Sequence, residues 1–400
     1  MSSKHHDSVR DRKASAFGVF VAFLRMGLVS FGGPVAHIGY FRDEFVVRRR
    51  WLADKAYADL VALCQFLPGP ASSQVGIALG LSQSGIIGAI AAWVGFTLPS
   101  AILLVLFAAG LQISGGVDIG WLHGLKVVTV AVVAHAVWTM GRQLCPDRPR
   151  ATLAVLATIG VLVLPGVSGQ IAVIVLGAFV GAIWLDASAG EKSTSVDFGV
   201  TRSAGVAALV LFFLLLILLP GIASGTGLIY AELFDSFFRS GALVFGGGHV
   251  VLPLLQAEVV PPGWVDNDRF LAGYGAAQAI PGPLFSFAAY LGYVAQGWGG
   301  AVLCLVAIFV PAFLLVIGVL PFWTRLSASA YARSTLAGVN AAVVGLLLAA
   351  LYDPVFTSAI RSGEDLALAL GAFALLAFWK VSPVIVVVVT AIASALLRLL

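Results

Sequence analysis

Two arginines inside apolar segments are the most unusual chemical groups of this sequence. Arg25 lies about ten residues into its segment, which at about 1.5 Å per residue is about 15 Å deep, near the middle of a membrane. Arg239 lies at the equivalent place in a second apolar segment. Such an arginine usually lines the path of a substrate or ion, and its planar guanidinium suits bidentate binding of oxyanions. The pair predicts an anion site; alternatively, the side chains extend to the membrane surface or pair with Glu44 and Glu258.

Glycine and proline interrupt apolar segments at two kinds of break, Phe-Gly-Gly and Pro-Gly-Pro, each of which occurs twice. Lipid cannot satisfy the backbone groups that a break frees, so breaks occur only beside protein or a water-filled cavity. The N-termini of the half-helices would then direct their partial positive charge at an anionic substrate, whereas the alternative is a kink that serves packing. We expect the break residues, with the flanking amides and hydroxyls, to bind the anion: Phe31, Gly32, Gly33, Pro34, Gln65, Pro68, Gly69, Pro70, Ser72, Ser73, Phe245, Gly246, Gly247, Gly248, Gln278, Pro281, Gly282, Pro283 and Ser286.

Three further side chains could relay a proton or an anion. His37 and His249 each follow a Gly-Gly break by a few residues, and a histidine near its ordinary pKa can carry a proton, although a packed neutral histidine is an equal interpretation. Lys126 offers a cation where the second half of the chain has Asn340, and we rank it below Arg25.

Motifs of enzymes are not found. The sequence contains no phosphate-binding loop with Lys-Ser/Thr, no Gly-x-Ser-x-Gly elbow and no Asp/Glu/His cluster with metal spacing. The cysteines, Cys64, Cys145 and Cys304, lie far apart without the spacing of a metal site. We therefore expect no catalytic residues, no metal and no cofactor.

The elements that must position these groups are membrane helices. Hydrophobic residues make up 60% of the chain and charged residues 10%, against about 25% charged in soluble domains, which excludes a water-soluble fold. The net charge of +4 comes from Lys and Arg in short loops, so it indicates topology and not a nucleic-acid partner. Uninterrupted spans are predicted at 84–110, 121–140, 204–219, 300–322 and 335–352, and broken ones at 14–47, 56–81, 151–185, 228–260, 270–296 and 365–400.

The two series of motifs form an internal repeat. Segment 23–33 (FLRMGLVSFGG) aligns with 237–247 (FFRSGALVFGG), and 65–70 (QFLPGP) aligns with 278–283 (QAIPGP). An internal repeat indicates the architecture of the whole chain more strongly than any single predicted helix. We predict an all-α polytopic membrane protein with a first repeat in residues 1–186, a connection with one extra transmembrane helix in 187–227, and a second, inverted repeat in 228–400.

Loop charges support the inversion. The loop 41–55 is basic, whereas its counterpart 254–269 is mainly acidic, so equivalent loops are expected on opposite faces of the membrane. The N-terminus and loop 41–55 are both basic, and both stay cytoplasmic only if the chain turns back at Phe31-Gly32-Gly33-Pro34. We therefore predict re-entrant hairpins at the breaks and a cytoplasmic N-terminus. A tilted, kinked span is the alternative.

The four break motifs, taken with Trp51-Leu52 and Gly248-His249, resemble the chromate ion transporter family in its long, two-domain form. The resemblance covers nearly the whole chain. It implies a multi-pass protein of the bacterial inner membrane that moves chromate outward and confers chromate resistance, with the motif residues as candidate ligands.

The leading hypothesis is therefore a secondary transporter for chromate, driven by ion gradients. A carrier of sulfate or another oxyanion is an alternative, because chromate and sulfate share charge and tetrahedral shape, and a passive anion channel is another. The expected partners are chromate or a related oxyanion and the lipid bilayer, with a homodimer as a further expectation.

Overall fold

The computed structural model describes residues 13–113, 120–185 and 198–397, and this part of the chain consists of helices and connections without strands. Six of its helical segments are long and apolar enough to cross a membrane: Ala71–Ile113, Gly120–Leu144, Val167–Trp184, Arg202–Thr226, Leu284–Ala328 and Ala330–Ala359. The expected all-α polytopic membrane fold is confirmed. The polar connection that begins at Asp186 falls largely outside the described residues.

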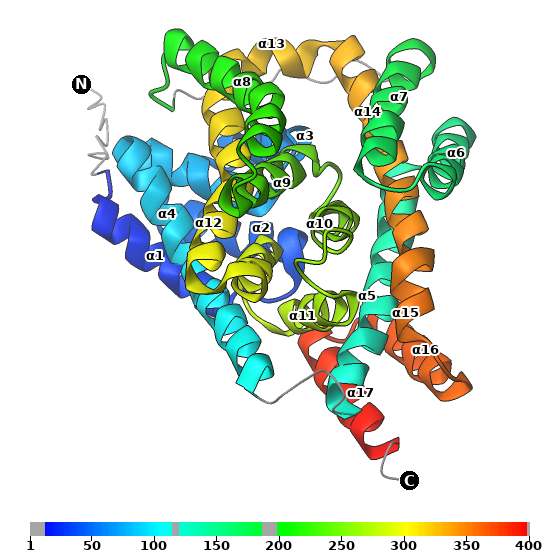
Figure 1. Ribbon diagram of the computed structural model, residues 1–400. Helices are drawn as coiled ribbons and strands as arrows, with labels where there is room; N and C mark the ends of the chain where they lie inside the picture. The colour runs from blue at the N-terminus through cyan, green and yellow to red at the C-terminus, as the bar shows by residue number, and fades with distance from the viewer. Residues whose placement is uncertain (1–12, 114–119, 186–197, 398–400) are drawn as a thin grey trace, which may run out of the picture.

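Each half of the chain contains a series of short and long helices (Figure 1). The first half contains α1 (Ala16–Val29), α2 (Gly33–Phe41), η1 (Arg42–Arg48), α3 (Asp54–Phe66), α4 (Ala71–Ile113), α5 (Gly120–Leu144), α6 (Arg148–Val163) and α7 (Val167–Trp184). After α8 (Arg202–Thr226), the second half contains α9 (Ile229–Leu243), η2 (Gly248–Val250), α10 (Val251–Val259), α11 (Asn267–Ala279), η3 (Leu284–Ser286) and α12 (Phe287–Val319). The chain ends with η4 (Leu320–Phe322), α13 (Trp323–Ala328), α14 (Ala330–Ala350), η5 (Leu351–Phe356), α15 (Thr357–Ala359), α16 (Gly363–Ala377) and α17 (Pro383–Leu397).

The helices that lead into the breaks are short. α1 has 14 residues and α3 has 13, so each is about 20 Å long, less than the hydrocarbon core of about 30 Å. Each Pro-Gly-Pro break turns at a glycine with positive φ, 120° at Gly69 and 108° at Gly282, a backbone conformation that favours glycine. Pro34 lies in the first turn of α2. The breaks are therefore local consequences of glycine and proline.

The long helices α4 and α12 each contain a sharp reversal. Ser84 and Gly85 leave helical geometry with φ/ψ of −138°/28° and 61°/−151°, and Gln296 and Gly297 repeat these angles at −145°/28° and 62°/−151°. In a straight helix, residues eight apart are separated by about 12 Å. A Cβ at Gly80 would instead collide with the carbonyl oxygen of Gly88. The chain therefore turns back, and glycines allow its two arms to touch.

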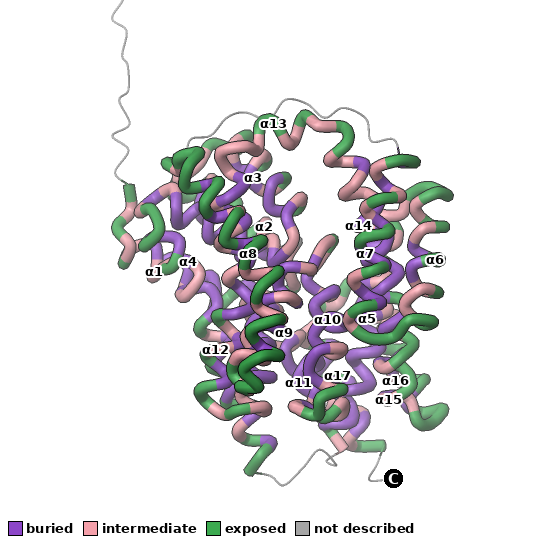
Figure 2. Tube along the Cα trace, turned by 45° about the horizontal axis from the view of Figure 1, so that its top comes forward, coloured by how far each residue is buried: buried purple, intermediate pink, exposed green. Residues whose placement is uncertain are grey.

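The helices pack as two groups that each contain elements from both halves (Figure 1). In one group, α1 packs against α4, α9 against α12, and α4 against α12, with α8 outside. In the other group, α14 packs on α6 and α7, while α5 packs on α16 and α17. The pair α10 and α11 lies between them, with α11 against α5. Figure 2 shows the exposed positions along the outer helices, such as α6 and α8, and the buried ones in the interior. This arrangement places the four breaks between the groups.

Candidate functional site

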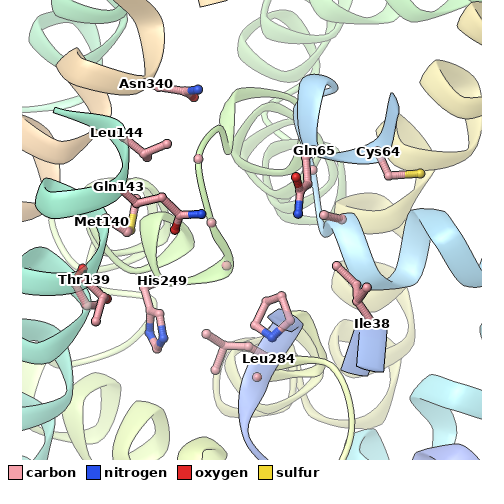
Figure 3. A pocket seen from close by; sticks show the side chains of 18 of the residues that line it. Ile38, Cys64, Gln65, Thr139, Met140, Gln143, Leu144, His249, Leu284 and Asn340 are labelled. Atoms are coloured by element: carbon pink, nitrogen blue, oxygen red, sulfur yellow. Dashed lines mark hydrogen bonds between the residues drawn. The ribbon is translucent and has the colours of Figure 1, made fainter. Parts of the chain in front are cut away.

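A cavity of about 760 Å³ lies where the breaks meet. Figure 3 shows its interior, with Gln65 of α3 and Gln143 of α5 directed into it from opposite sides and His249 at another edge. Many of the predicted site residues line it: Gly32, Gly33, Pro34, Gln65, Gly69, Gly246, Gly247, Gly248, His249, Gln278 and Gly282. The structure thus brings residues of both Gly-Gly and both Pro-Gly-Pro breaks to one site.

Backbone hydrogen bonds join the breaks of one half to those of the other. The N–H of Gly69 donates to the carbonyl oxygen of Val244 at 2.7 Å, and the N–H of Gly282 donates to that of Ser30 at 2.9 Å. Val244 and Ser30 occupy equivalent places, directly before the two Phe-Gly-Gly motifs. Each Pro-Gly-Pro turn therefore donates a hydrogen bond to a carbonyl group at the end of a helix from the opposite half. Backbone groups at a break need such partners within the protein, because lipid offers none.

A polar stripe on α5 was missed by the sequence interpretation. His135, Thr139 and Gln143 all line the cavity, and their spacing of four residues places them on one helix face. That spacing within an otherwise apolar helix is the signal that could have identified them. From α14, Arg333 and Asn340 also reach the cavity; the sequence had indicated Arg333 only as a loop charge and Asn340 only as the counterpart of Lys126.

Several polar atoms at the cavity have no hydrogen-bond partner within the described part of the chain. These are Oδ1 of Asn340, and Nε and Nη2 of Arg333. Nη1 of Arg333 donates to the carbonyl oxygen of Ser327 at 3.1 Å, which fixes the guanidinium at the start of α14. Asp59, which also lines the cavity, interacts with a neighbouring group. Free guanidinium and amide N–H groups can donate to an oxyanion.

The two histidines have different surroundings. Nδ1 of His249 lies 2.8 Å from the hydroxyl of the fully buried Tyr274, at the edge of the cavity. Nδ1 of His37 lies 3.4 Å from Oγ of Ser72 and is buried outside the cavity lining. Each histidine therefore connects a Gly-Gly break to the helix beside the Pro-Gly-Pro break of its own half.

The arginines proposed as anion ligands lie away from the cavity lining. Nη2 of Arg239 is 2.8 Å from Oδ2 of Asp235 and 3.1 Å from Oε2 of Glu258, so two carboxylates compensate its charge. This is the pairing that the sequence offered as the alternative. Arg25 is exposed on the surface of α1. Glu44 pairs with Arg48 and Arg49 at 2.8 and 2.7 Å.

Lys126 belongs to a polar network at the opposite side of the molecule. Its Nζ lies 3.0 Å from Oδ1 of Asp268, whose Oδ2 lies 3.6 Å from Nη2 of Arg361. Nearby, Nε2 of His123 lies 2.7 Å from Oδ1 of Asp365. These contacts join α5 and α11 to the start of α16.

The remaining predicted residues flank the breaks without lining the cavity. Ser286 donates from Oγ to the carbonyl oxygen of Pro283 at 2.7 Å, as a residue in a tight turn does. The residues in this class are Phe31, Pro68, Pro70, Ser72, Ser73, Phe245, Pro281, Pro283 and Ser286.

The cavity extends to one side of the breaks. Its wall contains the side of α3 at Asp59 and Ala62, the C-terminal half of α5, and the N-terminal half of α14 with α13. Of α11, the counterpart of α3, only Ala277 and Gln278 line it. The opposite side is occupied by the network around Asp268.

A cavity enclosed by broken helices, with a mainly apolar lining and a few polar side chains, is typical of a membrane transport protein. The sequence model of the chromate transporter family matches this chain in two segments, residues 17–182 and 231–395, so the chain belongs to the chromate transporter family, a family of transporters and not of enzymes.

The chain is similar to several known proteins. It is 31% identical to a chromate transport protein of Pseudomonas aeruginosa, over 93% of this chain and 90% of that protein. It is 26% identical to a chromate transport protein of Cupriavidus metallidurans, over 91% and 89% of the two chains. An uncharacterized transporter of Bacillus subtilis is 36% identical over 29% of this chain and 66% of its own length. No solved structure matches.

Proposed function

We propose that this protein is a secondary transporter that exports chromate across the bacterial inner membrane. The observation that carries the proposal is the cavity formed by all four breaks, lined by residues that include Arg333 with unpartnered buried N–H groups within the described structure, in a member of the chromate transporter family. The relatives in Pseudomonas aeruginosa and Cupriavidus metallidurans, which bear the name chromate transport protein, supply the choice of anion.

The broken helices support a pair of inverted repeats with re-entrant hairpins. α1 and α3 are too short to cross the membrane, and the chain reverses again at Ser84-Gly85 after about 20 Å of helix. In this arrangement α1 with α2, and α3 with residues 71–83, enter and leave on the same face. The basic loop 41–55 then remains cytoplasmic with the N-terminus, as the loop charges require.

Arg333 is assigned the role of the permanent positive charge at the anion site. Its Nε and Nη2 have no partner in the described structure, whereas the charge of Arg239 is compensated. Gln65, Gln143 and Gln278 add amide N–H groups, and helices begin at the cavity at α2 and α4. A role of Arg25 and Arg239 in binding the anion stays a prediction, and the contacts of Arg239 favour a structural role.

The placement of the cavity supports the proposed outward direction of transport. α3 begins beside the basic loop 41–55, so a cavity that extends along α3 faces the cytoplasm and loads anions from it. The ion pairs around Asp268 occupy the other side. A cavity that is closed on one side favours a carrier that alternates its exposure over a passive channel.

The test uses inverted membrane vesicles, in which export appears as uptake. Arg333→Gln is expected to lower the affinity for labelled chromate at least about tenfold, because a charge-assisted hydrogen bond contributes about 1.5–3 kcal/mol. The matched control is Arg325→Gln, an exposed arginine on α13 outside the cavity lining, which should transport normally. Equal transport by both variants would remove Arg333 from the site.

Competition decides between chromate and other oxyanions. Unlabelled sulfate should compete poorly with chromate in the same vesicles if chromate is the substrate. Equal competition would make the protein a general carrier of tetrahedral oxyanions, and non-saturable flux would make it a channel.

A further inference from the structure

A cluster of buried hydroxyl groups lies behind the breaks in the first half of the chain. Oγ of Ser30, Oγ of Ser73 and Oγ1 of Thr97 are buried, on residues no more than 2% exposed, and none has a hydrogen-bond partner within the described residues. Unpaired buried hydroxyl groups are costly and call for an explanation. We call Ser30, Ser73, Thr97 and their neighbour Ser100 the hydroxyl cluster.

Helix packing places these residues on the facing sides of α1 and of the two arms of α4. Ser73 lies three residues from Gly76, whose Cβ would be 3.0 Å from Phe23, so Ser73 is on the face of α4 that packs on α1. Thr97 lies in the other arm of α4, directly after Phe96. A Cβ at Gly27 of α1 would lie 2.7 Å from the carbonyl oxygen of Phe96, so this arm also packs closely on α1. The C-terminal end of α1 is thus held between the two arms of α4, and Ser30 is its C-cap.

The Pro-Gly-Pro turn of the second half closes the cluster. The N–H of Gly282 donates to the carbonyl oxygen of Ser30 at 2.9 Å, and a Cβ at Gly282 would lie 2.8 Å from Oγ of Ser100. Gly282 also lines the cavity. The hydroxyl cluster is therefore separated from the proposed anion site by a single turn of backbone.

The second half of the chain lacks this cluster. At the positions equivalent to Ser30, Thr97 and Ser100 it has Val244, Phe309 and Ala312. Ser286 corresponds to Ser73, and its hydroxyl is already bonded to the carbonyl oxygen of Pro283. Among its described residues, the second half also has one buried hydroxyl without a partner, Ser240 on α9, but at a position equivalent to Met26 and not to the cluster. The cluster itself therefore has no counterpart in the second half, which supports a ligand that binds once per chain.

We propose that the hydroxyl cluster is a site for one sodium ion that couples to transport, an inference that rests on the proposed transport function. The C-terminal end of α1 carries partial negative charge, and such ends coordinate small cations in carriers with broken helices. The cluster contains hydroxyls and no carboxylate, which suits a monovalent ion better than Ca²⁺ or Mg²⁺. A bound ion would fix Ser30, and through it Gly282, at the cavity wall.

Binding is tested on the purified full-length protein without chromate. The melting temperature and the binding of labelled sodium are measured in sodium, potassium or choline chloride at equal ionic strength. Sodium is expected to raise the melting temperature and to bind once per chain, while potassium and choline do not. A melting temperature that is the same in all three salts would overturn the site.

Two variants and a matched control locate the site. Thr97→Val and Ser73→Ala each remove one oxygen and should weaken sodium binding at least about tenfold. Ser286→Ala, at the equivalent place in the second half, should bind sodium as the unchanged protein does. Equal losses in Ser286→Ala and Ser73→Ala would overturn the assignment.

Further results distinguish the sodium site from a proton site and from the proposed transport function. Stabilisation that depends on pH without sodium, and that His37→Gln abolishes, would show a proton site and overturn the sodium site. Sodium binding in a protein that fails to move chromate would contradict the proposed function alone. Chromate transport without sodium binding would contradict this inference alone.

Discussion

Arg239 shows how contacts change the meaning of a residue. A lone arginine in an apolar segment predicts an ion path, and the sequence supports that interpretation equally for Arg25 and Arg239. In the folded chain, Arg239 lies between Asp235, one turn earlier on α9, and Glu258, at the end of α10. Asp235 lies four residues before Arg239, so this pair was readable from the spacing of one helical turn, whereas the contact with Glu258 depends on how α10 packs against α9.

Charge-compensating substitutions distinguish these roles of Arg239. Arg239→Gln alone should destabilise the protein by about 3–5 kcal/mol, because two buried carboxylates lose their partner. The triple variant Asp235→Asn, Arg239→Gln and Glu258→Gln should recover folded protein and chromate transport. Yield by size-exclusion chromatography and uptake by vesicles are the measurements. A triple variant that folds but does not transport would restore Arg239 as an anion ligand.

Other cavity residues were predictable to different degrees. The glycines and prolines of the breaks act on their own backbone, so the sequence identified them directly. Arg333 resembles any cytoplasmic loop arginine, because its position at the cavity depends on how α13 and α14 fold over the site. His135, Thr139 and Gln143 recur every four residues, which places them on one face of a helix. Polar residues that only pack against other helices show the same spacing, so the pattern alone does not identify a cavity.

At the scale of elements, the predicted span boundaries coincide with the reversals of α4 and α12. The sequence separated segment 56–81 from 84–110 and segment 270–296 from 300–322, and the chain turns at Ser84-Gly85 and at Gln296-Gly297. The close contact between the arms was not predictable. It depends on Gly80 meeting Gly88 and Gly292 meeting Gly300, which single-residue propensities do not report.

Alanine substitutions test these contacts. Gly88→Ala and Gly300→Ala should each destabilise the protein by about 1–3 kcal/mol or more, because the new methyl would meet the backbone of the opposite arm. Gly371→Ala on α16 is the control, since a Cβ there has open space. Thermal stability in detergent is the measurement. Unchanged stability in Gly88→Ala would contradict the tight reversal.

At the scale of the whole molecule, the network around Asp268 lies on the side opposite the cavity. Lys126 and Arg361 both approach this carboxylate, at 3.0 and 3.6 Å. If Asp268 is neutralised, Lys126 and Arg361 lose their ion-pair partner, and the cavity should be exposed more often on that side. The expectation follows from two alternative arrangements of one cavity, and a substitution that weakens one favours the other.

Cysteine labelling measures this shift. In a protein without its native cysteines, Gln143→Cys should react with an impermeant maleimide from the cytoplasmic face only. Adding Asp268→Asn should increase labelling from the opposite face severalfold, whereas the exposed control Glu364→Gln should not. Labelling from both faces without Asp268→Asn would indicate a continuous pore and contradict the carrier.

The reciprocal hydrogen bonds of Gly69 to Val244 and of Gly282 to Ser30 make each half complete the other. If the gene is divided between the codons of residues 186 and 198, we expect neither product to accumulate alone, because two buried turns would lose their acceptors. Co-expression of both products should restore chromate resistance, and accumulation of one product by itself would contradict the dependence. We therefore expect the two halves to be retained together during evolution. Because backbone atoms make these bonds, the side chains of the two halves can diverge in sequence while the hydrogen bonds between the halves are kept.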